Sequence, residues 1–155
     1  MQAILVLHDI RSAQNVGALF RTADAIGISK IYLSIITPGP VDRFGRPRSD
    51  IAKTALGAEK TILSEHYEDI GTLIKKYKSD GYTVIAIEQS DKAIDYKKVE
   101  KKEKMFFIVG NEVDGLAQEI LEQVDIVAQI PMIGEKESLN VSVAGGIVLF
   151  RILDN

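Results

Sequence analysis

Three short polar segments carry the side chains whose types and spacing could do chemistry. The first contains Asn15 and, six residues later, Arg21. A guanidinium can hold a phosphate through two parallel hydrogen bonds. An asparagine near a helix start can cap that helix or contact a ligand. A cap and a surface salt bridge would explain the same two residues, so this segment alone leaves both interpretations open.

The second segment, residues 106–116, predicts a buried strand that runs into a turn with two glycines and three polar side chains. Gly110 would allow a positive φ angle or the close approach of another backbone. Glu112 lies where a carboxylate could order an arginine or bind a substrate hydroxyl. A simple strand–turn–helix unit, with Asp114 near the helix N-terminus, accounts for Asp114 and Gly115 but less well for residues 110–112.

The third segment contains Ser138, Leu139 and Asn140, directly before an apolar run at residues 141–153. A surface helix normally has a polar face, and this run has almost none before Arg151. We therefore expect a terminal helix that is covered on two sides. The alternative is a loosely packed terminal helix, which its apolar residues argue against.

Two features of this third segment restrict the backbone. Pro131 removes a backbone donor and keeps Ile130 extended. Gly145 and Gly146 each cost about 1 kcal/mol relative to alanine inside a helix. Such a pair indicates that another backbone passes close to this helix.

The elements that must position these segments alternate between strand and helix patterns. Near-continuous apolar runs predict strands of a parallel sheet, and apolar residues at helical spacing predict helices. The alternation favours an α/β fold, a mostly parallel six-stranded sheet with helices on both faces, whose ligands bind beyond the carboxyl ends of the strands. We therefore expect the site in the loops at residues 8–14, 110–115 and 131–138. The predicted strands are residues 3–7, 31–35, 83–87, 105–109 and 126–130, with a weaker one at 61–63; the predicted helices are 16–26, closed by Gly27, then 50–56, 67–78, 116–123 and 139–153.

The composition excludes several classes of site. With no cysteine the chain has no disulfide, thiol nucleophile or cysteine-based zinc site, and two histidines disfavour a histidine metal site. A Gly-x-Gly-x-x-Gly motif, a Walker A sequence and a Gly-x-Ser-x-Gly elbow are all missing. No signal peptide or membrane-spanning run is recognisable, so we expect a cytoplasmic protein.

The charge of the chain gives no global nucleic-acid signature, because the formal net charge is −3. One local basic cluster, Arg43, Arg46, Arg48 and Lys53, falls within eleven residues. On charge alone, a solvated loop explains this cluster at least as well as a nucleic-acid surface.

Together, the three segments resemble the three motifs of the SpoU (TrmH-like) RNA 2′-O-ribose methyltransferases of the SPOUT superfamily. The motifs match residues 15–24, residues 109–116, and residues 130–132 with 138–142. Residues 53–59 resemble a further segment that is common in the family. The resemblance covers essentially all 155 residues, and the motifs agree in order and spacing.

The resemblance implies a deep trefoil knot near the C-terminus, a homodimer whose active sites draw on both subunits, and S-adenosylmethionine (AdoMet) as methyl donor. It implies methyl transfer to a ribose 2′-hydroxyl of tRNA or rRNA, with no metal and no membrane partner. The matching cofactor-binding positions are Ile87, Gly110, Ile130, Met132, Ser138 and Leu139, and the matching catalytic positions are Asn15, Arg21, Glu112, Ser138 and Asn140.

Arg21 occupies the position of a family arginine that has been regarded as the group that activates the hydroxyl. Because a guanidinium has a pKa above about 12, we favour a phosphate clamp that stabilises the developing alkoxide. Larger relatives carry extra RNA-binding domains, whereas residues 1–155 are expected to form a single methyltransferase domain. RNA would then contact the catalytic domain itself, through Arg11, Arg43, Arg46, Arg48 and Lys53.

Two other functions remain as alternatives. A non-catalytic RNA-binding module on the same fold is disfavoured because the matching catalytic residues are intact. An unrelated nucleotide-binding protein with a flavodoxin-like sheet is disfavoured by the Ser138-Leu139-Asn140 context. The sequence does not choose between tRNA and rRNA.

Overall fold

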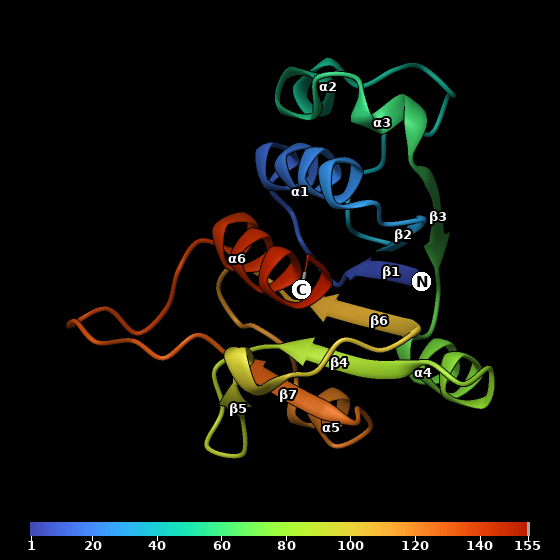
Figure 1. The fold of residues 1–155 in the computed structure, drawn as a ribbon. Helices are drawn as coiled ribbons and strands as arrows, with labels where there is room; N and C mark the ends of the chain where they lie inside the picture. The colour runs from blue at the N-terminus through green and yellow to red at the C-terminus, as the bar shows by residue number, and fades with distance from the viewer. Residues whose placement is uncertain (155) are drawn as a thin grey trace.

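A seven-stranded parallel sheet forms the centre of the computed structural model, which describes residues 1–154 (Figure 1). All neighbouring strands pair in parallel. The α/β class and the parallel sheet are confirmed, whereas the predicted number of six strands was wrong. From edge to edge the strands are β3 (Leu63–Tyr67), β2 (Lys30–Ser34), β1 (Gln2–Leu7), β6 (Lys104–Val109), β4 (Thr83–Ile87), β7 (Ile126–Gln129) and β5 (Ile94–Asp95).

The central strands are buried on both faces, as their continuous apolar sequences predict. Across β1, β6 and β4, the register aligns Leu5 with Phe107 and Phe107 with Ile85, and all three side chains are fully buried. Side chains that alternate with these belong to a second apolar cluster on the opposite face, which includes Val6 and Ile108. The sheet therefore has a core on each side.

Helices cover both faces of the sheet, as predicted. In Figure 1, α1 (Ala13–Ile26) and α6 (Val141–Leu153) lie side by side on one face, with α2 (Ser49–Ala55) and α3 (Ala58–Thr61) outside α1. The short 3-10 helix η1 (Tyr96–Lys98) contacts α6 on the same face. The other face carries α4 (Ile70–Ser79) and α5 (Gln118–Leu121). None of the helices in residues 1–154 has the length and hydrophobicity needed to span a membrane.

The largest local errors of the sequence prediction fall on edge strands. A strand at residues 61–63 and a helix from residue 67 were predicted, whereas β3 extends to Tyr67 and α4 begins at Ile70. Only Tyr67 is buried in β3, so an apolar run is missing there. Asp69 then caps α4 by accepting a hydrogen bond from the Thr72 N–H at 2.6 Å. The two-residue β5 was not predicted because so short a strand has no periodicity.

The terminal helix α6 is covered on one side by its own chain, and cover of its second side by another subunit stays a prediction. One face packs into the core, whereas Val143, Ile147 and Phe150 are 49%, 38% and 42% exposed in the single chain. A Cβ atom at Gly145 would lie 2.9 Å from Leu19 Cδ2 of α1. The element that approaches this glycine is therefore a side chain of α1 and not, as predicted, another backbone.

Candidate active site

Three predicted site residues, from three distant segments, meet in one hydrogen-bond network at the carboxyl edge of the sheet. Glu112 follows β6, Asn15 lies in the first turn of α1, and Asn140 precedes α6. The Asn15 Nδ2 group donates to Glu112 Oε1 at 3.3 Å, and the Asn140 Nδ2 group donates to Asn15 Oδ1 at 3.1 Å. The amide group of Asn15, which is buried, thus links the other two side chains.

Glu112 holds the start of α1 in place. Its carboxylate accepts the backbone N–H groups of Ser12 at 3.1 Å and Arg11 at 3.3 Å. Partial burial acts to raise the pKa of Glu112, but backbone N–H donors and the Asn15 amide outweigh it and lower this pKa below its ordinary value. Glu112 is therefore a carboxylate at neutral pH, and its oxygens already accept hydrogen bonds. It orders the Ser12–Asn15 turn instead of an arginine side chain.

Asn140 connects this network to α6. Its Oδ1 atom accepts the backbone N–H of Ser142 at 2.9 Å and of Val143 at 3.4 Å, which makes Asn140 the N-cap of the helix. The Ser142 hydroxyl donates to the same oxygen at 2.6 Å. The side chain thus has its acceptor in the cap and its donor on Asn15, so the start of α6 is fixed relative to α1.

A cavity of about 440 Å³ lies beside this network, and we call it the sheet-edge cavity. It is formed where β4, β6 and β7 end and where α6 begins. Its volume is within the range of small-molecule sites. Ile87, Ala128, Ile130 and Leu139 supply an apolar lining. Every predicted cofactor-binding residue lines it: Ile87, Gly110, Ile130, Met132, Ser138 and Leu139.

Gly110 is needed for the shape of this cavity. A Cβ atom there would lie 2.7 Å from the carbonyl carbon of Gly115 and 2.7 Å from Leu116 Cγ. Because the first of these neighbours is backbone, it cannot rotate away. The prediction of a close backbone approach at Gly110 is thus confirmed, and the approaching backbone belongs to the same turn.

Two polar residues of the cavity were missed by the sequence prediction. Glu88 Oε2 accepts the backbone N–H of Leu116 at 2.9 Å, and Gln89 Nε2 donates to the carbonyl oxygen of Ile130 at 2.8 Å. Both residues directly follow β4 and line the cavity. The rule that ligands bind beyond strand ends would have found them, had it been applied to β4 as well.

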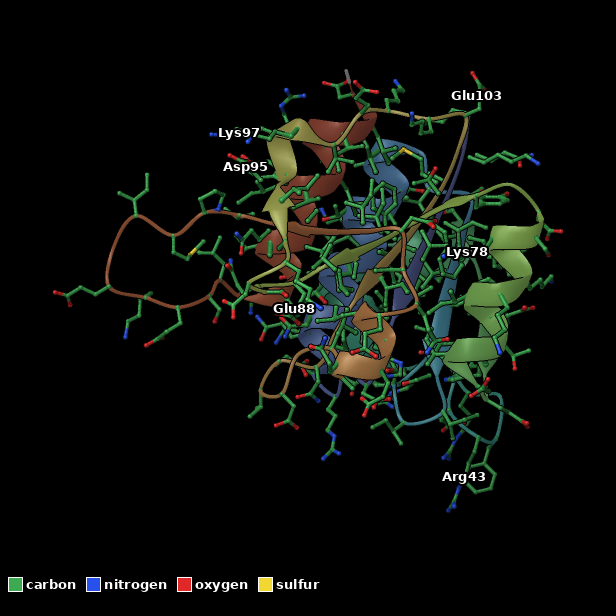
Figure 2. The ribbon with its side chains drawn as sticks, turned by 90° about the horizontal axis from the view of Figure 1, so that it is seen from below. Arg43, Lys78, Glu88, Asp95, Lys97 and Glu103 are labelled. Carbon is green, nitrogen blue, oxygen red and sulfur yellow. The ribbon has the colours of Figure 1, made fainter. Side chains whose placement is uncertain are left out.

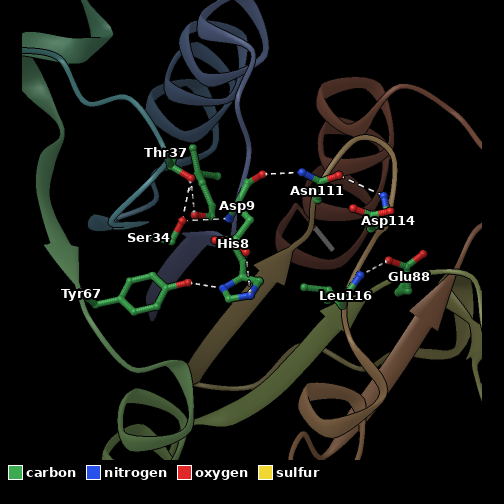
Figure 3. A network of polar contacts seen from close by, with 10 residues as sticks. His8, Asp9, Ser34, Thr37, Tyr67, Glu88, Asn111, Asp114 and Leu116 are labelled. Atoms are coloured by element: carbon green, nitrogen blue, oxygen red, sulfur yellow. Dashed lines mark hydrogen bonds and ion pairs between the residues drawn. The ribbon is translucent and has the colours of Figure 1, made fainter.

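A second set of polar contacts holds the turn after β6 (Figure 3). Asn111 donates through Nδ2 to the carbonyl oxygen of Asp9 at 2.8 Å and accepts the backbone N–H groups of Val113 and Asp114. Asp9 has a positive φ of 56°, a conformation that is uncommon outside glycine. The loops after β1 and β6 are therefore fixed to each other.

His8 and Tyr67 extend this set of contacts toward the edge strand β3. The His8 Nδ1 atom is hydrogen-bonded to the Tyr67 hydroxyl. Burial lowers the pKa of His8 and raises that of Tyr67, and the Asp9 carboxylate only partly offsets the effect on His8. Both groups are therefore neutral at pH 7.

Arg21 lies outside the sheet-edge cavity. It lines a separate cavity of about 390 Å³, the Arg21 cavity, between α1, α2 and the first turn of α6. Asn140 lines the first cavity and Ser142 the second, so the first turn of α6 separates them. Arg21 is exposed and, within residues 1–154, its side chain forms no ion pair or hydrogen bond. The surface salt bridge that was the alternative explanation for Arg21 is therefore not formed.

The chain matches one protein family over almost its whole length. The sequence profile of the SpoU rRNA Methylase family covers residues 2–150. The chain belongs to the SpoU family. The tRNA (guanosine(18)-2′-O)-methyltransferase of Escherichia coli K12 is 31% identical over 145 residues, which are 94% of this chain and 60% of that enzyme. The chain therefore spans about three fifths of the length of this curated relative.

Two solved structures of the family superpose closely on this SpoU-family chain. The TrmH/SpoU tRNA modifying enzyme of A. aeolicus has a TM-score of 0.84 at 27% identity, over 97% of this chain and 73% of that one. The AdoMet-bound rRNA methyltransferase of Sinorhizobium meliloti has a TM-score of 0.84 at 28% identity, over 97% and 55%. The likeness includes the sheet and helices that enclose the sheet-edge cavity.

The basic residues predicted for RNA binding are spread over the surface of the SpoU-family chain and differ in their pairing. Arg46 is paired with Asp42 at 2.8 Å and Arg48 with Asp50 at 2.6 Å. Lys53, in contrast, lines the Arg21 cavity. The structure thus brings Lys53 to Arg21 and leaves Arg11 and Arg43 exposed elsewhere. Within residues 1–154, no three acidic or histidine side chains group as metal ligands would.

Proposed function

We propose that this SpoU-family protein transfers a methyl group from AdoMet to a ribose 2′-hydroxyl of tRNA or rRNA. One observation carries the proposal: the sheet-edge cavity, lined by all matching cofactor positions, adjoins the Glu112/Asn15/Asn140 network, and Arg21 lies across a single helix turn. The AdoMet-bound relative at 28% identity supports the cofactor. The tRNA 2′-O-methyltransferase at 31% identity supports the reaction.

The residues present fit AdoMet. The apolar lining suits an adenine ring, and the backbone of Gly110 and Ile130 can approach a ligand closely. Ile87, Gly110, Ile130, Met132, Ser138 and Leu139 would hold the cofactor, which supplies an electrophilic methyl group on a sulfonium. Gln89, which also lines the cavity, keeps the Ile130 carbonyl in place by a hydrogen bond.

The substrate side of the proposal rests on Arg21 and Lys53, two cations that line one cavity. We assign them to a phosphate of the RNA, with Arg21 also stabilising the alkoxide that develops on the attacking 2′-oxygen. Asn15 and Asn140 would orient the ribose against the methyl donor, and Glu112 would hold Asn15. RNA contact is proposed to lie within this catalytic domain, with Arg11, Arg43, Arg46 and Arg48 as further contacts.

The remaining proposals concern assembly. We propose a cytoplasmic homodimer in which Val143, Ile147 and Phe150 of α6 contact a second copy, since these apolar side chains are exposed in one chain. A C-terminal trefoil knot is proposed as well. The proposal is supported by the contacts of α6, which packs against both α1 and η1. The 3-10 helix η1 belongs to the segment that connects β4 to β6.

Methyl transfer from radiolabelled AdoMet to bulk RNA tests the reaction, with AdoMet affinity measured by calorimetry. We expect Arg21→Ala to lower the transfer rate by roughly 100-fold or more, as loss of one electrostatic donor does, and to leave AdoMet affinity unchanged. Lys75→Ala, which removes an exposed cation of α4 that lines neither cavity, is the control. Full activity of Arg21→Ala would exclude Arg21 from the reaction. AdoMet binding without any transfer would favour the non-catalytic module.

Sedimentation tests the homodimer. Ile147→Asp introduces a charge into the exposed α6 stripe and is expected to produce a folded monomer. Leu63→Asp, on the exposed edge strand β3, is the matched control and should stay dimeric. A monomeric wild-type protein would contradict the dimer.

A further inference from the structure

An exposed aromatic side chain lies between two arginines in the loop that connects β2 and α2. Phe44 is 67% exposed. The guanidinium carbons of Arg43 and Arg46 lie 4.8 Å and 5.0 Å from the centre of its ring. Single exposed apolar residues are common on proteins. An exposed ring with two guanidinium groups against it is a more specific combination.

Asp42 builds the tight loop that exposes this ring. Its Oδ1 atom accepts the backbone N–H groups of Phe44 at 2.8 Å and Arg46 at 3.0 Å. Its Oδ2 atom accepts Arg46 Nε at 2.8 Å, and a backbone bridge joins Val41 to Pro47 below the tip. Gly45 completes the turn with a φ of 76°. The ring is thus presented on an ordered hairpin instead of packing into the core.

The hairpin lies at the edge of the sheet where ligands of this fold bind. It follows the carboxyl end of β2, whereas Glu88 follows the carboxyl end of β4, and the two strands are parallel to the strands between them. In Figure 2, Arg43 projects away from the body of the molecule, on the side opposite Glu103, which precedes β6. Phe44 is therefore exposed at the same edge of the sheet as the sheet-edge cavity.

We propose that Phe44 is a stacking platform for an unpaired base of the RNA substrate, with Arg43 contacting a neighbouring phosphate. The inference rests on the proposed RNA methyltransferase function and narrows its substrate to RNA with an unpaired base near the modified ribose. Proteins recognise single-stranded RNA by stacking bases on aromatic rings and guanidinium planes, whereas a duplex keeps its bases stacked inside.

The two arginines have different parts in this proposal. Arg46 is held by Asp42 and keeps the ring oriented. Arg43 forms no ion pair in the described part of the chain, so its guanidinium can move from the Phe44 ring to a phosphate and lose only the cation–π contact. Their positive charge also favours RNA over an apolar protein surface as the occupant.

The first experiment compares Phe44→Ala and Phe44→Tyr in binding to a hairpin RNA with an unpaired loop and to a perfect duplex. Stacking contributes about 1–3 kcal/mol per base, so Phe44→Ala should weaken binding of the hairpin RNA by about 5- to 150-fold. The duplex should bind as before. Because no charge is removed, the slope of log K against log salt should stay unchanged, and Phe44→Tyr should restore binding.

Arg43→Ala provides the contrasting variant. It should lower the salt slope by about 1 for both RNAs, since one phosphate contact is lost. Equal losses for hairpin and duplex in Phe44→Ala, or none for either, would overturn the stacking role. A dimer that dissociates in Phe44→Ala while RNA affinity is kept would show that the ring contacts protein.

Fluorescence offers a direct readout, because the chain contains no tryptophan. Phe44→Trp introduces a single reporter whose emission should be quenched by the hairpin RNA and not by the duplex. Quenching by both RNAs, or by neither, contradicts stacking on an unpaired base. If the wild-type protein methylates RNA and the Phe44 variants bind the hairpin RNA as tightly as the wild type does, only this inference fails. If the wild-type protein binds no RNA, the proposed function fails with it.

Discussion

The sheet-edge cavity and the Arg21 cavity lie on two sides of the first turn of α6 but are built differently. The first is enclosed by strand ends whose side chains and backbone are hydrogen-bonded to each other, as in the Glu88–Leu116 and Gln89–Ile130 contacts. The second cavity is lined by two exposed cations, Arg21 and Lys53. Its apolar lining residue Val143 is itself half exposed.

This difference indicates that a single chain forms the proposed cofactor site in advance, whereas the proposed substrate site is open. Hydrogen-bonded strand ends preorganise a small-molecule site, which lowers the entropy lost on binding. Exposed cations attract a polyanion over several ångströms and lose their influence as salt screens them. The two cavities should therefore respond differently to substitution.

The largest effect is expected for Gly110→Ala. The new Cβ would meet the Gly115 backbone and Leu116 at 2.7 Å, so we expect unfolding free energy to fall by about 1–3 kcal/mol and AdoMet affinity at least about tenfold. Gly134→Ala is the control, because a Cβ there has no neighbour within 4 Å. Calorimetry and urea unfolding measure both. Unchanged AdoMet binding by Gly110→Ala would show that this cavity does not hold the cofactor.

Asn140 tests the connection between the two cavities. Asn140→Ala removes the α6 cap and should cost about 1 kcal/mol of unfolding free energy. Asn140→Asp keeps an acceptor for the cap, next to the positive end of the helix dipole, and loses only the donor to Asn15. We expect near-wild-type stability for Asn140→Asp and impaired methyl transfer for both variants. Full transfer by Asn140→Asp would make the Asn15 contact dispensable.

Glu88 tests whether hydrogen bonds preorganise the sheet-edge cavity. Glu88→Ala leaves the Leu116 N–H without its acceptor, at a cost of about 0.5–1.5 kcal/mol, whereas Glu88→Gln retains a carbonyl oxygen. AdoMet affinity should fall severalfold in the first variant and less in the second. RNA affinity should change in neither variant. If Glu88→Ala lowered RNA affinity as much as AdoMet affinity, the two cavities would not act as separate binding sites.

The smallest effect concerns pH and His8. Burial lowers the folded-state pKa of His8 below 6.5, so the unfolded chain takes up this proton first as pH falls. The contribution of His8 to stability is thus present above pH 6.5 and is lost as pH falls through the lowered pKa. Between about pH 7.5 and 5.5, His8→Gln should lose less unfolding free energy than the wild type. An identical pH dependence in urea unfolding would contradict the assignment.

The sequence prediction succeeded where a signal is local and repeated. Gly27 ends α1 in the left-handed conformation, with a φ of 80°, as predicted from its place after an apolar helical stripe. The six positions matched to the family's cofactor site all line the sheet-edge cavity, although Ile87 lies outside the three motif segments. β5 could not be predicted, because only its pairing with β7 makes residues 94 and 95 a strand.

The sequence by itself determined the parallel α/β core, because strands buried on both faces need continuous apolar runs, and it determined which polar residues lie at strand and helix ends. Only the tertiary structure decided which of these meet. Glu112, Asn15 and Asn140 are joined by hydrogen bonds near 3 Å, while Arg21 belongs to the neighbouring cavity. A hydrogen bond depends on separations of tenths of an ångström, and those are set by how α1, α6 and the end of β6 pack.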